Sequence, residues 1–158
     1  MGMNVSSSLI GQTSLPTSPS IQVIANPAAG ADWQFQNNAL GAVTMRLYQV
    51  YAKLVTATTV LAPAREVHLQ TFVPAGPPVT MWRFPVPNDQ GDATTIEYLW
   101  SMVTGTFVLG ASHAVLGLPY NVDLPVNTFI ASFTDGLQPT DQWSNITLLW
   151  APFSRFPI

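Results

Sequence analysis

The sequence predicts an all-β protein: a single-domain β-sandwich or jelly roll of about eight to ten strands with an extended N-terminal arm. Three observations indicate this fold. Apolar and polar residues alternate with a period of two in many short segments, as they do on half-buried strands. Fourteen prolines and ten glycines punctuate these segments at short intervals. The length of 158 residues is that of one ordinary domain, and many short, evenly spaced strands are typical of sandwiches and jelly rolls.

The chain divides into an arm, a domain and a tail. Residues 1–19 are rich in Ser, Thr, Gly and Pro, and they offer too little apolar surface to offset their ordering entropy. They form either a loose terminus or an arm that becomes ordered on a partner. The sandwich domain spans residues 20–150, and residues 151–158 form a C-terminal tail. The first strand covers residues 20–25 and is ended by Asn26 and Pro27.

The next segments alternate, and the alternation then changes phase. Trp33 and Phe35 alternate with polar residues. Further on, the apolar positions are first Val43, Met45 and Leu47 and then Val50, Ala52 and Leu54. A slip of one residue turns side chains to the other face, which predicts a bulge or bend near Gln49. A helix over residues 43–55 is the alternative, but the β-branched run at 55–60 favours a strand.

Further strands follow at short intervals. In the first of them, odd-numbered apolar residues face one way, while Glu66, His68 and Gln70 face the other. Loops at 74–78 and 88–92 contain the Pro, Gly, Asn and Asp residues that suit turns. The predicted strands are 67–73, 81–84, 94–103, 106–109, 114–116, 128–133 and 145–150.

The composition excludes several classes of protein. The chain has no cysteine, so a disulfide scaffold, a thiol nucleophile and a zinc–thiolate site are ruled out. Five cationic residues cannot form the basic surface that nucleic-acid binding requires. No charge occurs between Glu97 and Asp123, but that stretch is interrupted by Gly, Ser, Thr and Pro and has no basic flank, so we expect no membrane span. Charged residues make up 8% of the chain, against roughly 25% in typical domains. We therefore expect other protein chains to cover much of the surface.

Residues able to perform chemistry are few, and we expect neither enzymatic activity, nor a cofactor, nor a bound metal. Glu66 and His68 share a strand face, but no third metal ligand is evident. Ser112 and His113 are neighbours on a predicted strand, so their side chains should point to opposite faces and form no nucleophile–base pair. Asp89 and Asp92 flank a glycine in a turn and supply too few oxygens for calcium.

Aromatic residues supply the candidate interaction surface. The five tryptophans could form a sugar or base platform, although most fit better in the core. Trp82 lies beside Arg83 and Phe84 in a segment bounded by prolines, and it is either a core residue or an interface hot spot. The apolar C-terminal tail contributes Phe153, Arg155 and Phe156 to the same candidate surface.

Several segments together resemble a known family. The sequence Asp-Gln-Trp-Ser-Asn-Ile-Thr-Leu-Leu at 141–149, preceded by Leu124-Pro125 and the strand at 128–133, resembles the closing hairpin of small tailed-phage virion proteins. Residues 31–33 (Ala-Asp-Trp) and the run at 56–60 followed by Arg65 are similar too. The resemblance covers roughly residues 20–150. It implies a capsid cement, or decoration, protein with a jelly-roll fold, which bridges major capsid subunits and stabilises the shell.

The expected partners follow from this resemblance and from the low charge. They are the major capsid protein and further copies of the chain, as a homodimer or homotrimer on the capsid exterior. Alternative functions are a tail or collar component of the virion and a carbohydrate-binding β-sandwich. A cupin-type enzyme is a weaker alternative, because two isolated histidines do not supply its metal ligands.

Overall fold

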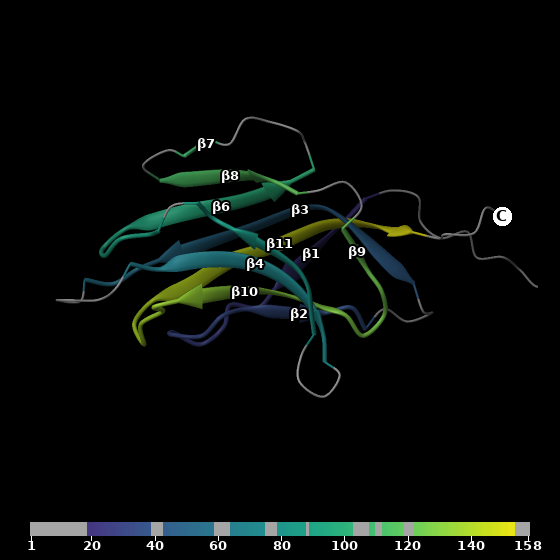
Figure 1. The fold of residues 1–158 in the computed structure, drawn as a ribbon, viewed down its shortest axis with the longest axis horizontal. Helices are drawn as coiled ribbons and strands as arrows, with labels where there is room; N and C mark the ends of the chain where they lie inside the picture. The colour runs from purple at the N-terminus through teal and green to yellow at the C-terminus, as the bar shows by residue number, and fades with distance from the viewer. Residues whose placement is uncertain are drawn as a thin grey trace, which may run out of the picture.

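The protein is an all-β sandwich of two sheets (Figure 1). The computed structural model describes residues 19–38, 43–58, 64–74, 79–87, 89–102, 108–109, 112–118 and 122–153. Eleven strands lie within this part of the chain: β1 (Ser20–Ile24), β2 (Gln34–Gln36), β3 (Thr44–Val55), β4 (Glu66–Val73), β5 (Val79–Pro85), β6 (Thr95–Ser101), β7 (Val108–Leu109), β8 (His113–Gly117), β9 (Val122–Leu124), β10 (Phe129–Asp135) and β11 (Gln142–Phe153).

The order of the strands is that of a jelly roll. The larger sheet has the order β1-β11-β3-β6-β8-β7, and the smaller sheet has the order β2-β10-β4-β5. The antiparallel pairs β1–β11, β2–β10, β3–β6 and β4–β5 are those of one long hairpin rolled up on itself. Strands β7, β8 and β9 are additions to this plan. β8 pairs with β6 in parallel, and β9 pairs with β3 beyond the end of β6.

The bulge predicted near Gln49 is present in β3. Against β11, Leu47 lies opposite Trp150 and Gln49 lies opposite Leu149, so Tyr48 is the extra residue. Met45 and Leu47 before this point and Val50, Ala52 and Leu54 after it are all buried. The bulge therefore turns both apolar sets to the same inner face. The alternative of a helix over residues 43–55 is wrong.

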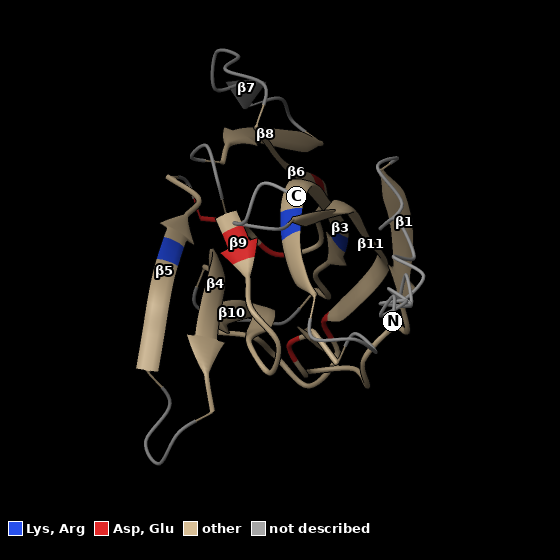
Figure 2. Ribbon diagram, turned by 90° about the vertical axis from the view of Figure 1, so that its right-hand side faces the viewer, with Lys and Arg blue, Asp and Glu red and all other residues tan. Residues whose placement is uncertain are grey.

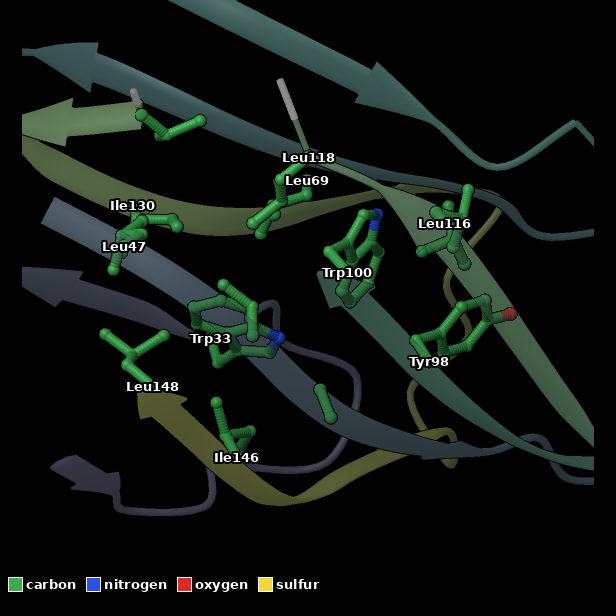
Figure 3. Packing of buried hydrophobic residues seen from close by; sticks show 14 of the residues in the cluster. Trp33, Leu47, Leu69, Tyr98, Trp100, Leu116, Leu118, Ile130, Ile146 and Leu148 are labelled. Carbon is green, nitrogen blue, oxygen red and sulfur yellow. The ribbon is translucent and has the colours of Figure 1, made fainter. Parts of the chain in front are cut away.

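The core fills the space between the two sheets (Figure 3). Three of its largest side chains are Trp33, Trp100 and Trp143, each at most 1% exposed. Tyr98 stacks on Trp100 with a centroid distance of 5.5 Å and lies 5.6 Å from Trp143. Its hydroxyl donates a hydrogen bond of 2.7 Å to Gln90 Oε1, so its one polar atom is satisfied.

Several strand boundaries differ from the prediction. The run at 55–60 was expected to be a strand, but β3 ends at Val55, and Thr56 instead bonds through Oγ1 to the carbonyl of Gly91. The Thr56 backbone still donates to the carbonyl of Thr94 at 2.9 Å, while residues 59 and 60 lie outside the described chain. In contrast, β11 continues to Phe153 by pairing with the start of β3, so residues 151–153 are strand and not tail. Of the strand expected at 106–109, the structure describes only β7.

Candidate interaction surfaces

Strand β5 forms one edge of the smaller sheet and is exposed over most of its length. Within the described chain it pairs with β4 alone, and Met81 is an extra residue in that pairing. Trp82 lies opposite buried Thr71 and is itself 51% exposed, because no described strand lies beyond β5. Val79 and Met81 are exposed as well. These three side chains form an apolar edge that we call the β5 surface.

The three residues predicted together at 82–84 separate onto two faces. Phe84 lies opposite Leu69, is half-buried and packs against the core. Arg83 lies opposite Gln70 on the outer face, and its guanidinium carbon lies 5.1 Å from the ring centroid of Phe133 on β10. Trp82 and Arg83 are therefore accessible to a partner, whereas Phe84 serves mainly the fold.

The outer face of the smaller sheet is aromatic beside the β5 surface. Phe72 on β4 and Phe129 on β10 stack at 5.1 Å with an interplanar angle of 8°. The His68 and Phe133 rings lie 6.1 Å apart on the same face. Phe133 is exposed, so this aromatic cluster extends the apolar area around Arg83.

His68 and Glu66 come together as their spacing predicts. His68 Nε2 lies 2.9 Å from Glu66 Oε1, but neither ring nitrogen has the geometry of a hydrogen bond with any described residue. Burial and the charge of Arg83 lower the pKa of His68, against the opposing effect of Glu66. No group of three potential metal ligands occurs among the described residues. The pair is therefore a local contact of the aromatic face.

A second exposed apolar area lies on the larger sheet. β1 is the edge of that sheet, and its inward side chains include polar Ser20 and Gln22. Its outward side chains are Ile21 and Val23, which are 71% and 65% exposed. This is the reverse of an ordinary edge strand, which turns its apolar side to the core.

The apolar outward side chains continue from β1 across the larger sheet. The strand register places one residue of each of five strands side by side on the outer face, in a line that we call the outer row: Val23, Thr147, Tyr51, Leu99 and Val115. Four of the five have apolar or aromatic side chains. Leu149 lies beside Ile21 in the next row. Figure 2 shows that β1 and β5 lie on opposite sides of the molecule.

The C-terminal part of the predicted surface is only partly described. Phe153 ends β11, and the guanidinium carbon of Arg46 lies 3.4 Å from its ring centroid. Arg46 also donates two hydrogen bonds to Asp123, of 2.8 and 3.1 Å. Phe153 is therefore held by the fold, at the junction of β3, β9 and β11. Arg155 and Phe156 lie outside the described residues.

The residues that carried the family resemblance are structural. Arg65 is buried and donates hydrogen bonds of 2.8 and 3.1 Å to the two carboxylate oxygens of Asp141, and it also pairs with Asp92. Burial would raise the pKa of Asp141, but hydrogen bonds from Arg65 and from the backbone of Gln138 and Ala57 outweigh it, and this pKa is lowered. The composition could not reveal this pair, because its members are far apart in the sequence.

Asp32, in the Ala-Asp-Trp segment that also carried the resemblance, has a structural role as well. Asp32 accepts hydrogen bonds from Ser132 Oγ, from the Thr134 backbone and from Thr134 Oγ1, all of 2.7 to 3.0 Å. These bonds join the segment before β2 to β10. The neighbouring Trp33 fills the core, so this part of the sequence fixes packing and presents no site.

The prediction for Ser112 and His113 is wrong in its geometry. Ser112 precedes β8, where the chain bends, and its Oγ lies 3.1 Å from His113 Nδ1. The two side chains do not alternate because only His113 belongs to the strand. Both are exposed, and no ion pair joins His113 to a described carboxylate. The pair therefore lacks the buried orienting group and the water exclusion that a catalytic pair uses.

Two further expectations concerned a platform and a membrane span. Trp33, Trp100 and Trp143 are buried, so a platform of five tryptophans is wrong. Trp82 is on the β5 surface and Trp150 is half-buried.

Within the part of the chain that the structure describes, no helix could cross a membrane.

The comparisons with known proteins add little to this picture. The sequence matches no family model and no curated protein. Among solved structures it is similar to a structure of the Gt strain of infectious bursal disease virus, with 17% identity over 89% of this chain and a TM-score of 0.28. A structure of the Gx strain of the same virus gives 16% identity over 88% of the chain and a TM-score of 0.27. The chain spans about a third of those proteins, 35% and 33%. TM-scores of this size do not establish a shared fold.

Proposed function

We propose that the protein is a structural virion component, a cement or decoration protein that binds the exterior of a phage capsid and bridges its major capsid subunits. One observation carries this proposal. Seven large apolar side chains are exposed in the described chain, and five of them lie on two of the edge strands, β1 and β5: Ile21, Val23, Val79, Met81 and Trp82.

Apolar, nearly uncharged sheet edges such as β1 and β5 favour binding to another protein chain. Soluble proteins protect the edges of their sheets with charges, because a free edge pairs with other chains. Here β1 carries no charged residue, and β5 carries only Arg83. Covering these edges with another protein removes apolar area from water and allows strand addition to the free ladder. A bridging protein requires two separate contact surfaces, and we assign β5 to the shell and β1 to a second copy of the chain, so that the oligomer carries more than one shell-binding surface. We assign the uncharged residues 1–19, which lead into β1, to contacts with the shell as well.

The β5 surface is the one that we assign to the major capsid protein. Trp82 is the anchor, since a half-exposed tryptophan beside an arginine is typical of interface hot spots. The test is co-sedimentation of the purified protein with shells assembled from a phage major capsid protein. We expect the double variant Met81→Lys/Trp82→Lys to bind about 30-fold more weakly or worse, as for loss of one hot spot.

A matched variant controls for the added charge. Thr95→Lys puts a lysine on an exposed position of the larger sheet, and we expect it to bind shells as the unchanged protein does. The double variant should keep its melting temperature, because Met81 and Trp82 are exposed. Equal binding by the double variant would contradict the assignment of the β5 surface. Binding to purified tails in place of shells would favour the alternative of a tail or collar component.

A further inference from the structure

We propose that a pocket at the margin of the sandwich binds one neutral sugar unit of a glycan. The pocket has a volume of about 320 Å³ and lies where β1 and β2, the edges of the two sheets, face each other. It is lined by Gln22, Phe35, Gln36, Asn37, Asn38, Met45 and Trp150. Its volume is at the lower end of the range for small-molecule sites, which suits a single ring. This inference does not depend on the proposed virion function.

The lining is uncharged and consists of an apolar side and a polar side. Phe35, Met45 and Trp150 supply an apolar side, and four amide side chains supply the polar side. Amides offer both donors and acceptors, as sugar hydroxyls do. A sugar ring has an apolar face and a polar rim, so it matches both sides. A purely apolar ligand would give the Gln36 and Asn38 side chains no hydrogen-bond partner, and a charged ligand would find no counter-charge.

Part of the polar side is already fixed in position. Asn37 is fully buried, and its Nδ2 donates to the carbonyls of Val43, at 3.0 Å, and Leu124, at 2.8 Å. Its backbone also bonds Thr128 and Asn127. This wall of the pocket therefore needs no rearrangement when a ligand enters, which lowers the entropic cost of binding.

Other amides of the pocket remain free to bind. The side chains of Gln36 and Asn38 form no hydrogen bond with any other described residue. Gln22 donates through Nε2 to the carbonyl of Val23 and keeps its oxygen as an acceptor. Gln22 also faces inward on β1, where a core residue would be apolar. A polar side chain at that position is explained by a polar ligand.

The test is ligand-observed NMR and calorimetry with the full chain. The probes are the methyl glycosides of glucose, galactose and mannose, together with N-acetylglucosamine, and glucuronic acid is the charged comparison. We expect at least one neutral probe to bind with a dissociation constant on the order of a millimolar, as for about a dozen non-hydrogen atoms. Glucuronic acid should bind no more tightly than the neutral probe.

Two variants and a matched control assign the site. Gln36→Ala and Asn38→Ala should each weaken binding about 3- to 10-fold, as for the loss of one hydrogen bond. Gln34→Ala changes the same residue type on the same strand, but outside the pocket, and should bind as the unchanged protein does. The proposal is overturned if no neutral probe binds, if the pocket variants bind as the control does, or if glucuronic acid binds more tightly.

Discussion

At the scale of single residues, the most demanding interaction is the ion pair between Arg65 and Asp141. Both side chains are fully buried, and 76 residues separate them in the sequence. Asp141 accepts further hydrogen bonds from the backbone N–H groups of Ala57 and Gln138, of 3.0 and 2.8 Å. Three segments of the chain, near residues 57, 65 and 138–141, thus meet at one carboxylate. Taking charges out of water is costly, so the buried ion pair favours this fold only when all of its hydrogen-bond partners are in place.

Removing the charge of Asp141 should destabilise the protein strongly. Asp141→Asn removes the buried counter-charge of Arg65 and leaves it only the partly exposed Asp92, and we expect a loss of about 3 kcal/mol in the free energy of unfolding. The comparison is Asp123→Asn, which breaks the partly exposed pair with Arg46 and should cost about 1 kcal/mol or less. Urea unfolding measures both. Equal losses in the two variants would contradict the assigned role of Asp141.

The same carboxylate predicts how stability depends on pH. The pKa of Asp141 is lower in the folded protein than in the unfolded chain, where it is about 3.9. Its contribution is therefore fully present above about pH 4 and is lost as the pH falls through the folded-state pKa. Thermal unfolding between neutral and acid pH measures this. The melting temperature of the unchanged protein should fall more steeply below pH 4 than that of Asp141→Asn, and parallel curves would refute this origin.

At the scale of elements, the long central strands rely on bulges. Between Ser144 and Thr147, β11 has one residue more than β3 opposite it. Asn145 lies in this bulge with φ of 53°, a left-handed conformation, and its N–H donates to Asn26 Oδ1 at 3.1 Å. As a result Trp143 and Ile146 both point into the core, although three positions separate them. Asn145 thus permits the bulge in β11, because Asn tolerates a left-handed conformation better than most residues.

The stability of variants at position 145 should depend on how well the new residue adopts a positive φ, and not on contacts of the asparagine side chain. We expect Asn145→Ala to cost about 1–2 kcal/mol of unfolding free energy, since a Cβ-bearing residue without local hydrogen bonds is strained there. Asn145→Gly should cost little or nothing, because glycine adopts positive φ freely. Chemical denaturation of both variants is the measurement. A glycine variant less stable than the alanine variant would show that the side chain, and not the conformation, matters.

At the scale of the whole molecule, the two exposed apolar areas lie on different sheets. Figure 2 shows few charged segments along the ribbon, with β1 and β5 on opposite sides. The β5 surface belongs to the smaller sheet. Ile21, Val23 and the outer row belong to the larger one. A contact through one area therefore leaves the other area free for a different partner.

We predict that the protein self-associates as a dimer or trimer through β1 and the outer row. Ile21→Lys/Val23→Lys places charges in that contact and should give a monomer by sedimentation analysis, folded as judged by a far-UV circular dichroism spectrum like that of the unchanged protein, because both side chains are exposed in the single chain. Met81→Lys/Trp82→Lys should keep the oligomeric state of the unchanged protein. A lysine variant of β1 that stays oligomeric would place the contact elsewhere.

Several properties follow from the sequence alone, because they are local. The period of two and the Pro and Gly punctuation predict an all-β fold. The change of phase between Leu47 and Val50 locates the β3 bulge to within one residue. The Glu66–His68 contact follows from their spacing on one strand. Each of these depends on the direction of neighbouring side chains, which the backbone of a strand fixes by itself.

Only the tertiary structure decides which strands become edges and what their side chains meet. Trp82 and Phe84 have the same phase on β5, yet Phe84 packs on the core and Trp82 is exposed. Arg65 is an ordinary cation in the sequence and becomes fully buried when three segments of the chain converge on Asp141. The alternation along a strand specifies the face of the sheet to which each side chain points, but it does not specify which other segment packs against that face. That choice depends on pairings between distant segments, which the jelly-roll order sets for the whole chain.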